Sequence, residues 1–196
     1  PTGSGARRRQ PATMELLERK TYLGDLRGLL AQASRGHGCM LFVGGEAGVG
    51  KSALVQEFTR SADGQTRILN GACDPLSTPR PLGPLFDMGA ALGADVTTLI
   101  RTPVPQFELF RSVLDALRAS SPSLMVVEDA HWADEATLDL LRYLGRRIAD
   151  VPALIVVTYR DDEVGPDHPL RRVAGELASQ NAVRRMALRP LSRAAV

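Results

Sequence analysis

The sequence has 196 residues, 44% hydrophobic and 23% charged, which matches the length and composition of one globular domain. The formal net charge of +2 and the scattering of arginines in pairs argue against a surface that binds nucleic acid. No apolar run reaches the roughly 18 residues of a membrane-spanning helix, and no signal segment is recognisable, so we expect a cytoplasmic protein without membrane contact.

The start of the chain differs in composition from the rest. Residues 1–13 are rich in Gly, Pro and Arg and show no apolar period. We therefore expect a disordered lead there, followed by one folded domain over residues 14–196. Leucines at helical spacing predict an amphipathic helix from Met14 to Ser34.

A strand, a glycine-rich turn and a helix come next. The apolar run Met40–Val43 predicts a buried strand, and helical periodicity extends from Ser52 to about Arg60. A second short strand, Arg67–Asn70, follows a turn signal. Cys39 and Cys73 each lie beside a predicted strand, so we expect both to be buried free thiols.

The remaining elements alternate between helices and strands. Four prolines between residues 74 and 84 predict an ordered but irregular connection. The pattern then predicts, in chain order, a helix over 85–92, a helix over 106–119 with Phe107, Phe110, Leu114 and Leu117 facing inward, a strand over 124–127, a helix beginning near Asp134, a strand over 154–158, a helix over 169–179 and a strand over 183–188. Short apolar strands separated by helices predict an α/β protein, with a five-stranded parallel sheet in a three-layer α/β/α fold.

The segment Gly45–Ser52 has the spacing Gly-x-x-x-x-Gly-Lys-Ser of a phosphate-binding loop (P-loop). Its glycines let successive N–H groups point inward, and the helix that follows adds partial positive charge. We expect Lys51 to reach the β- and γ-phosphates and the Ser52 hydroxyl to bind Mg²⁺. An ordinary glycine turn would not require Lys51, one of only two lysines in the chain. The predicted nucleotide-binding residues are Gly45, Glu46, Ala47, Gly48, Val49, Gly50, Lys51, Ser52 and Ala53.

Two carboxylates, Glu128 and Asp129, directly follow the apolar strand predicted over 124–127. Ligands bind at the carboxyl ends of strands in parallel sheets, so acids at this place indicate a site. Beside a phosphate-binding loop we expect Glu128 to bind Mg²⁺ and Asp129 to orient the attacking water, although a shift of one residue exchanges these roles. The alternative function, a cap for the next helix, is better filled by Asp134.

Further candidates follow the acids and the fourth strand. Arg160 is placed to contact a γ-phosphate at the same sheet edge, and the alternative is an exposed arginine paired with Asp161 or Asp162. His131 and Trp132 lie just beyond the acids. For His131 the sequence leaves open contact with the nucleotide site or with the neighbouring loop only. We expect a structural role for His131 and a packing role for Trp132.

The order of the strands distinguishes between nucleotides. The acidic strand is the third in sequence, because the strand over 67–70 lies between it and the loop. This order favours ATPases with an extra strand beside the loop strand over GTPases. No Asn-Lys-x-Asp motif for guanine occurs, so the expected ligands are ATP or ADP with Mg²⁺.

Several runs resemble the ATPase module of large bacterial LuxR-type regulators, which are signal-transduction ATPases with numerous domains (STAND) related to AAA+ proteins. They are Gly44–Leu54, Val127–Asp134, Val157–Arg160, Cys73–Leu85 and His168–Arg172. By this resemblance the fold is an AAA+-like P-loop NTPase. Two departures stand out. The family often has two aspartates where this chain has Glu128-Asp129, and its Gly-Arg-Glu near the adenine is matched only at Arg19.

The resemblance implies roles for the matching residues. Lys51 and Ser52 take the phosphate and Mg²⁺ positions, Glu128 and Asp129 form the acidic pair, and Arg160 is the sensor arginine. The family implies a switch in which ADP holds a closed monomer, while ATP and an inducer favour an oligomer that activates transcription. Slow hydrolysis then resets the switch.

We expect the lid, the sensor repeats and the DNA-binding helix-turn-helix of the family to lie outside this chain. Self-association and DNA binding then belong to the full-length protein. Two other functions remain open. One is a module that binds ATP or ADP without hydrolysis and organises assembly, and the other is a stand-alone AAA+ type ATPase.

Overall fold

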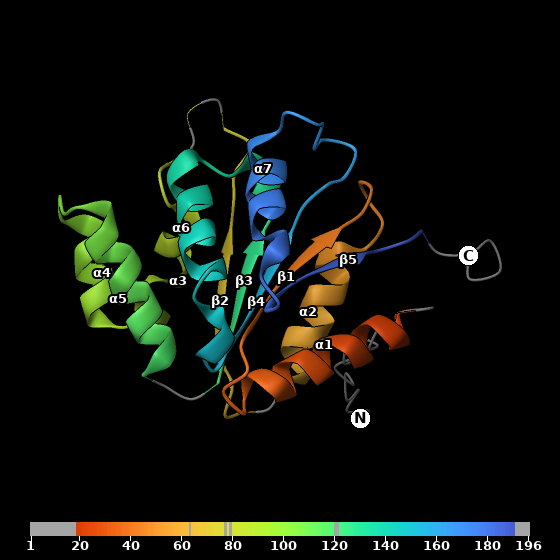
Figure 1. Ribbon diagram of the computed structural model, residues 1–196, viewed down its shortest axis with the longest axis horizontal. Coiled ribbons are helices and arrows are strands. Elements are labelled where there is room, and N and C mark those ends of the chain that lie inside the picture. The colour runs from red at the N-terminus through yellow and green to blue at the C-terminus, as the bar shows by residue number, and fades with distance from the viewer. Residues whose placement is uncertain (1–18, 63, 77, 79, 120–121, 191–196) are drawn as a thin grey trace, which may run out of the picture.

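The computed structural model describes residues 19–62, 64–76, 78, 80–119 and 122–190. A five-stranded sheet in the order β2-β3-β4-β1-β5 forms its centre, and every neighbouring pair is parallel (Figure 1). The strands are β1 (Cys39–Gly44), β2 (Arg67–Ala72), β3 (Ser123–Glu128), β4 (Ala153–Thr158) and β5 (Val183–Ala187).

Seven α-helices and three short 3₁₀ helices are found among the described residues. The α-helices are α1 (Lys20–Ala33), α2 (Lys51–Ser61), α3 (Gly83–Leu92), α4 (Ala94–Arg101), α5 (Gln106–Arg118), α6 (Glu135–Gly145) and α7 (Pro169–Glu176). The 3₁₀ helices are η1 (Ala130–Trp132), η2 (Ile148–Asp150) and η3 (Leu177–Ser179).

The sheet separates two hydrophobic cores, and β1 contributes to both because its side chains alternate between the faces. Leu41 and Val43 pack with α1 and α2, whereas Met40 and Phe42 pack in the core that α3, α5, α6 and α7 cover (Figure 1). Burial on both faces explains why β1, β3 and β4 are continuously apolar. The predicted three-layer α/β/α fold with a five-stranded parallel sheet is therefore confirmed.

The strand order places β4 between β1 and β3. This confirms the extra strand beside the loop strand that the sequence predicts. Because all strands are parallel, the residues that follow β1, β3 and β4 meet at one edge of the sheet. The predicted site residues on these three connections are thereby brought to the same side of the molecule.

Some predicted elements differ in extent from the observed ones. Helix α1 begins at Lys20, and the first residues of the predicted helix, like the predicted lead over 1–13, lie outside the described residues. Strand β2 continues to Ala72. The helix predicted over 169–179 is α7 followed by the separate 3₁₀ turn η3.

Two predictions about the helices on the α5 side are wrong. Helix α4 was not predicted. Gly93, with φ +105°, changes the direction of the chain after α3. The eight residues of α4 then bury a single side chain, Val96, so the sequence shows no apolar period there. Phe107 does not face inward but is 58% exposed and meets Tyr143 edge-on at the rim between α5 and α6. Leu109 and Val113 are the buried residues that the predicted face left out.

No helix in the described ranges combines the length and the apolar character required to cross a bilayer. The expectation of buried free thiols is confirmed for Cys39 and Cys73.

Candidate nucleotide-binding site

The loop between β1 and α2 requires its glycines. Gly48 and Gly50 have φ values of +73° and +93°, in the left-handed region that side chains with a Cβ rarely adopt. At Gly45 a Cβ would lie 2.8 Å from the carbonyl oxygen of Leu188, so the approach of the β5 end leaves no space for one. The conformation of the loop therefore explains why glycines stand at positions 45, 48 and 50.

The ammonium group of Lys51 lies inside this loop. Its Nζ donates hydrogen bonds to the carbonyl oxygens of Gly45 at 2.7 Å and Glu46 at 2.9 Å, and the residue is only 7% exposed. Burial lowers the pKa of Lys51, as does the charge of Arg160, while the charge of Asp129 opposes the shift. The charges predicted to act on one nucleotide thus act on one another.

The two carboxylates end β3 at the same sheet edge. Glu128 is the last residue of the strand, opposite Ala72 of β2, and both acids are half-buried. Asp129 has φ +53°, a strained conformation for a residue with a side chain, and its N–H donates to Oγ1 of Thr158 on β4 at 3.1 Å. The chain therefore turns directly after Glu128, at Asp129.

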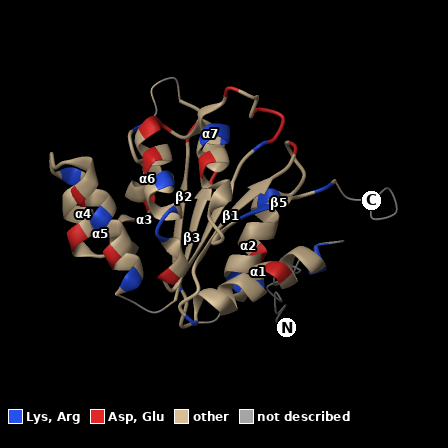
Figure 2. Cartoon of the chain, viewed as in Figure 1, with Lys and Arg blue, Asp and Glu red and all other residues tan. Residues whose placement is uncertain are grey.

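Arg160 follows β4 and lies beside the loop, but its salt-bridge partner is not either of the expected residues. Its Nη1 lies 2.6 Å from Oε1 of Glu163, and its guanidinium carbon lies 5.1 Å from the ring centre of Trp132. Arg160 therefore forms a salt bridge, as in the alternative interpretation, but with Glu163 and not with Asp161 or Asp162. Acidic residues run along the β4–α7 loop where this pair forms (Figure 2).

His131 is buried beside the loop that follows β4, a neighbouring-loop contact that the sequence left open. Its side chain is 1% exposed, and its Nε2 and Nδ1 lie 3.5 Å from Oε2 of Glu163 and 3.9 Å from Oδ1 of Asp129. Neither ring nitrogen has a hydrogen-bond partner among the described residues. Burial lowers the pKa of His131, although both carboxylates oppose the shift. Nothing in the sequence reveals this contact, because it joins two separate loops.

Arg19 is a second contributor that the sequence analysis did not assign. Its buried guanidinium donates from Nη2 to the carbonyl oxygen of Val49 at 2.6 Å and from Nη1 to that of Arg189 at 2.8 Å. The residue therefore ties the phosphate-binding loop to the segment after β5. Its match to the family motif at one position was the available signal.

The residues at this edge fit Mg²⁺ and a nucleotide. Mg²⁺ prefers oxygen ligands, and the exposed Ser52 hydroxyl and the carboxylates of Glu128 and Asp129 supply them. Lys51 places its donors inside a glycine-rich loop, where phosphate oxygens can replace the two carbonyl acceptors. The cation would neutralise phosphate charge there.

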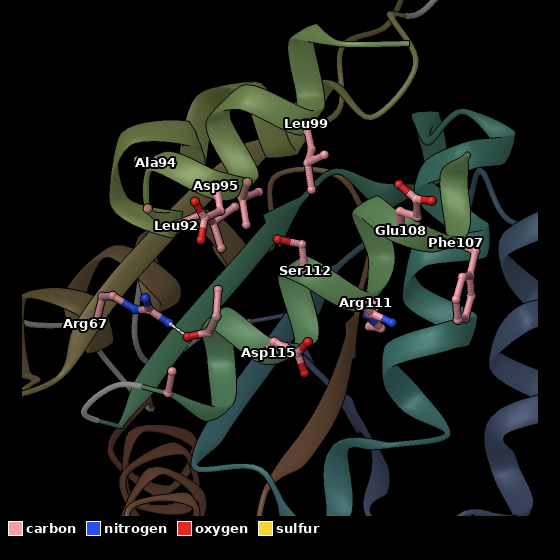
Figure 3. A pocket seen from close by; sticks show the side chains of 14 residues that line it. Arg67, Leu92, Ala94, Asp95, Leu99, Phe107, Glu108, Arg111, Ser112 and Asp115 are labelled. Atoms are coloured by element: carbon pink, nitrogen blue, oxygen red, sulfur yellow. Dashed lines mark hydrogen bonds between the residues drawn. The ribbon is translucent and has the colours of Figure 1, made fainter. Parts of the chain in front are cut away.

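A cavity of about 650 Å³ lies elsewhere, between β2, α4 and α5 (Figure 3). Arg67, at the start of β2, borders it and donates to the carbonyl oxygen of Ala116 at 2.7 Å. Its walls carry both signs of charge, including Arg111 and Asp115, and contain none of the predicted site residues. The predicted nucleotide-binding residues therefore lie outside this cavity.

Comparisons with known proteins concern the family and the fold of this chain. Residues 15–157 match the AAA ATPase domain family. A curated relative, an uncharacterised protein of Rhizobium meliloti (strain 1021), is 29% identical over an alignment that covers 90% of this chain. The chain spans 20% of the length of that relative.

Two solved structures show a similar fold. The ORC2 protein of Aeropyrum pernix, solved in ADPNP–ADP complexes, superposes with a TM-score of 0.60 at 16% identity, over 89% of this chain and 49% of that one. A STAND protein with a tetratricopeptide repeat sensor from Pyrococcus horikoshii gives a TM-score of 0.50 at 17% identity, over 85% of this chain and 23% of that one. At such identities the likeness concerns the fold alone.

Proposed function

The chain belongs to the AAA ATPase domain family, and we propose that it binds ATP and ADP with Mg²⁺ at the Gly45–Ser52 loop and hydrolyses ATP slowly. The observation that carries the proposal is the placement of Lys51. Its buried ammonium group lies within the glycine loop, close enough to Arg160 and Asp129 for their charges to act on its pKa. A cation enclosed by backbone and faced by these groups suits a polyphosphate.

We assign a role to each side chain from its position at the sheet edge. Lys51 and the N–H groups at the start of α2 hold the phosphates. Ser52 and Glu128 hold Mg²⁺, and Asp129, on the turn after β3, orients the attacking water. Arg160 interacts with the γ-phosphate, which only ATP carries. These assignments explain why the carboxylates and the arginine lie on adjacent connections at one sheet edge.

We further propose that the domain is the nucleotide switch of a LuxR-type bacterial regulator. The sequence runs around Lys51, Glu128 and Arg160 support this proposal, and the fold similarity to a STAND protein is compatible with it. The chain spans 20% of the length of its curated relative. In this proposal we therefore assign the inducer, the self-association and the DNA contact to the longer protein. A cytoplasmic location follows from this role.

Nucleotide content and affinity test the proposal. The purified domain is denatured, the released nucleotide is identified, and ATP and ADP are titrated with Mg²⁺ and then without it. Binding of adenine nucleotides with little response to GTP supports the proposal, and the absence of binding in this domain and in a longer chain contradicts it. Release of inorganic phosphate then separates a slow ATPase from a module that binds ATP without hydrolysis.

A further inference from the structure

Glu163 lies between two basic side chains at the edge of the proposed nucleotide site. Its Oε1 lies 2.6 Å from Nη1 of Arg160, within a salt bridge, and its Oε2 lies 3.5 Å from Nε2 of His131, beyond good hydrogen-bond distance. The carboxylate is therefore committed to one partner and within a small displacement of the other. At 37% exposure, the Glu163 side chain is free enough to move between them.

His131 is the unsatisfied member of this group. Its ring is 1% exposed and packs 4.4 Å from the ring of Trp132, yet both nitrogens lack a hydrogen-bond partner in the described part of the chain. A buried polar group without a hydrogen-bond partner destabilises the fold, so such groups are rare. Where one occurs, a role at a functional site is one explanation. The backbone of His131 is held separately, because Nε2 of His168 contacts the His131 carbonyl oxygen at 3.1 Å.

The charges around His131 come from three connections. Asp129 lies on the turn after β3, Glu163 and Arg160 on the loop after β4, and Lys51 at the start of α2. A negatively charged γ-phosphate near Lys51 attracts Arg160 and repels Glu163. The γ-phosphate therefore pulls Arg160 toward it and pushes Glu163 away, which weakens the salt bridge between the two residues.

Given that the site binds ATP, as proposed above, we propose that Glu163 and His131 determine its preference for ATP over ADP. Arg160 exchanges the Glu163 carboxylate for the γ-phosphate, and the released carboxylate turns to accept a hydrogen bond from Nε2–H of His131. A neutral imidazole with its proton on Nε2 supplies that donor. ADP lacks the γ-phosphate and leaves the Arg160–Glu163 pair in place, so only ATP binding includes the exchange.

The two residues therefore act in opposite directions. Glu163 opposes ATP binding because its salt bridge with Arg160 must break. His131 favours ATP binding because it accommodates a carboxylate that would otherwise remain unpaired beside the γ-phosphate. Neither residue contacts ADP in this scheme, so both are positioning residues whose effect appears in the ratio of two affinities.

The test compares the affinities of ADP and a β,γ-imido analogue of ATP, each with Mg²⁺, by calorimetry. Glu163→Gln is expected to tighten binding of the analogue about two- to fivefold, the range of a partly exposed ion pair, with ADP unchanged. His131→Phe is expected to weaken binding of the analogue by a similar factor. In the double variant His131→Phe should have no further effect, because no released carboxylate is left to accommodate.

Glu176→Gln is the matched control. It removes a glutamate whose Oε2 lies 2.8 Å from Nε of Arg142, at a place remote from the site. It should leave the ratio of the two affinities unchanged. His131→Asn, a smaller polar substitution, replaces His131→Phe if that variant does not fold. Glu163→Gln changes a partly exposed side chain and tests the inference independently of both His131 variants. Equal shifts for both ligands, additive effects in the double variant, or an equal effect of Glu176→Gln overturn the inference. If the unaltered chain binds neither ligand, the proposed function fails first. If it binds both but the ratio does not respond, only the inference fails.

Discussion

The guanidinium group of Arg19 holds the phosphate-binding loop through the carbonyl oxygen of Val49, at 2.6 Å. The same group reaches the carbonyl oxygen of Arg189 after β5 at 2.8 Å, and Leu188 in turn donates from its N–H to Gly44 at 2.8 Å. Three segments that are distant in the sequence thus meet at the loop. The residue before α1 therefore connects the shape of the loop to the chain that follows the sheet.

Replacement of Arg19 by alanine should lower both stability and nucleotide affinity. The partly buried hydrogen bonds to the Val49 and Arg189 carbonyl oxygens lose a charged donor, which corresponds to about 2 kcal/mol in the free energy of unfolding. Urea unfolding and ADP titration measure the two effects. Arg35→Ala is the control, because the exposed Arg35 donates to Ala31 within its own segment. Equal effects of the two substitutions would show that the Val49 contact does not hold the loop.

Lys51→Ala should weaken ATP and ADP to a similar extent, because both carry the β-phosphate that the ammonium group faces. Loss of a charged hydrogen-bond donor predicts an affinity decrease of about tenfold or more, measured by calorimetry with Mg²⁺. Lys20→Ala removes the other lysine of the chain, an exposed residue of α1, and should leave affinity unchanged. Unaltered ATP binding in Lys51→Ala would contradict the phosphate assignment.

The two acids are expected to separate in their effects. Asp129→Asn should retain nucleotide binding and lower the rate of phosphate release about a hundredfold or more, as loss of a general base does. Glu128→Gln should instead weaken the dependence of binding on Mg²⁺. Titrations over a range of Mg²⁺ concentrations, together with single-turnover hydrolysis, distinguish the two. The opposite pattern would exchange the roles of the residues.

Local patterns in the sequence predict the sheet and the loop well because those elements depend on local causes. The strands β1, β3 and β4 are apolar since both faces are covered, and Gly48 and Gly50 are required by their own φ values. Asp134 caps α6 as predicted, because its carboxylate and the Thr137 N–H are three residues apart.

Features that depend on how a loop or helix folds against its surroundings were not predictable in this way. Arg160 has several acids nearby in sequence, and only the folded loop selects Glu163. The buried position of His131 results from the packing of the β3 and β4 connections against each other. Phe107 satisfies the helical period, but α5 turns that position to its rim, where Tyr143 covers one edge. Periodicity defines a helix face and not its limits.

Cys73 should react far more slowly in the folded protein than in the unfolded chain, even at alkaline pH. Burial and the nearby charges of Asp134 and Asp129 raise its pKa from 9.0 to about 12. The thiolate is the reactive form, and its fraction at pH 8 is about a thousandfold smaller than in the unfolded chain. In a Cys39→Ala variant, Ellman's reagent should react rapidly with Cys73 only after addition of urea. The slow reaction of the folded protein should still become faster with increasing pH at pH 10. Rapid reaction of the folded protein at pH 8 would contradict the burial of this thiol.

Asp134 joins two parts of the fold that the sequence does not connect. Its carboxylate accepts hydrogen bonds from the Thr137 N–H at 3.0 Å, from the Thr137 hydroxyl, and from the Leu82 N–H at 3.2 Å. Leu82 precedes α3 and has φ +59°, an unfavourable conformation for leucine, so the contact stabilises a strained turn.

Asp134→Ala should therefore lower the free energy of unfolding by about 2 kcal/mol, which combines the loss of a helix cap with that of the Leu82 contact. Asp134→Asn should recover much of the loss, because asparagine is an equally good cap residue. Asp139→Ala, on the same helix, removes a surface pair with Arg142 and should cost well under 1 kcal/mol. Urea unfolding followed by the fluorescence of Trp132 measures all three. If Asp134→Ala costs no more than Asp139→Ala, the cap does not hold the Leu82 turn, and α3 must be positioned by its packing on β2, α4 and α5.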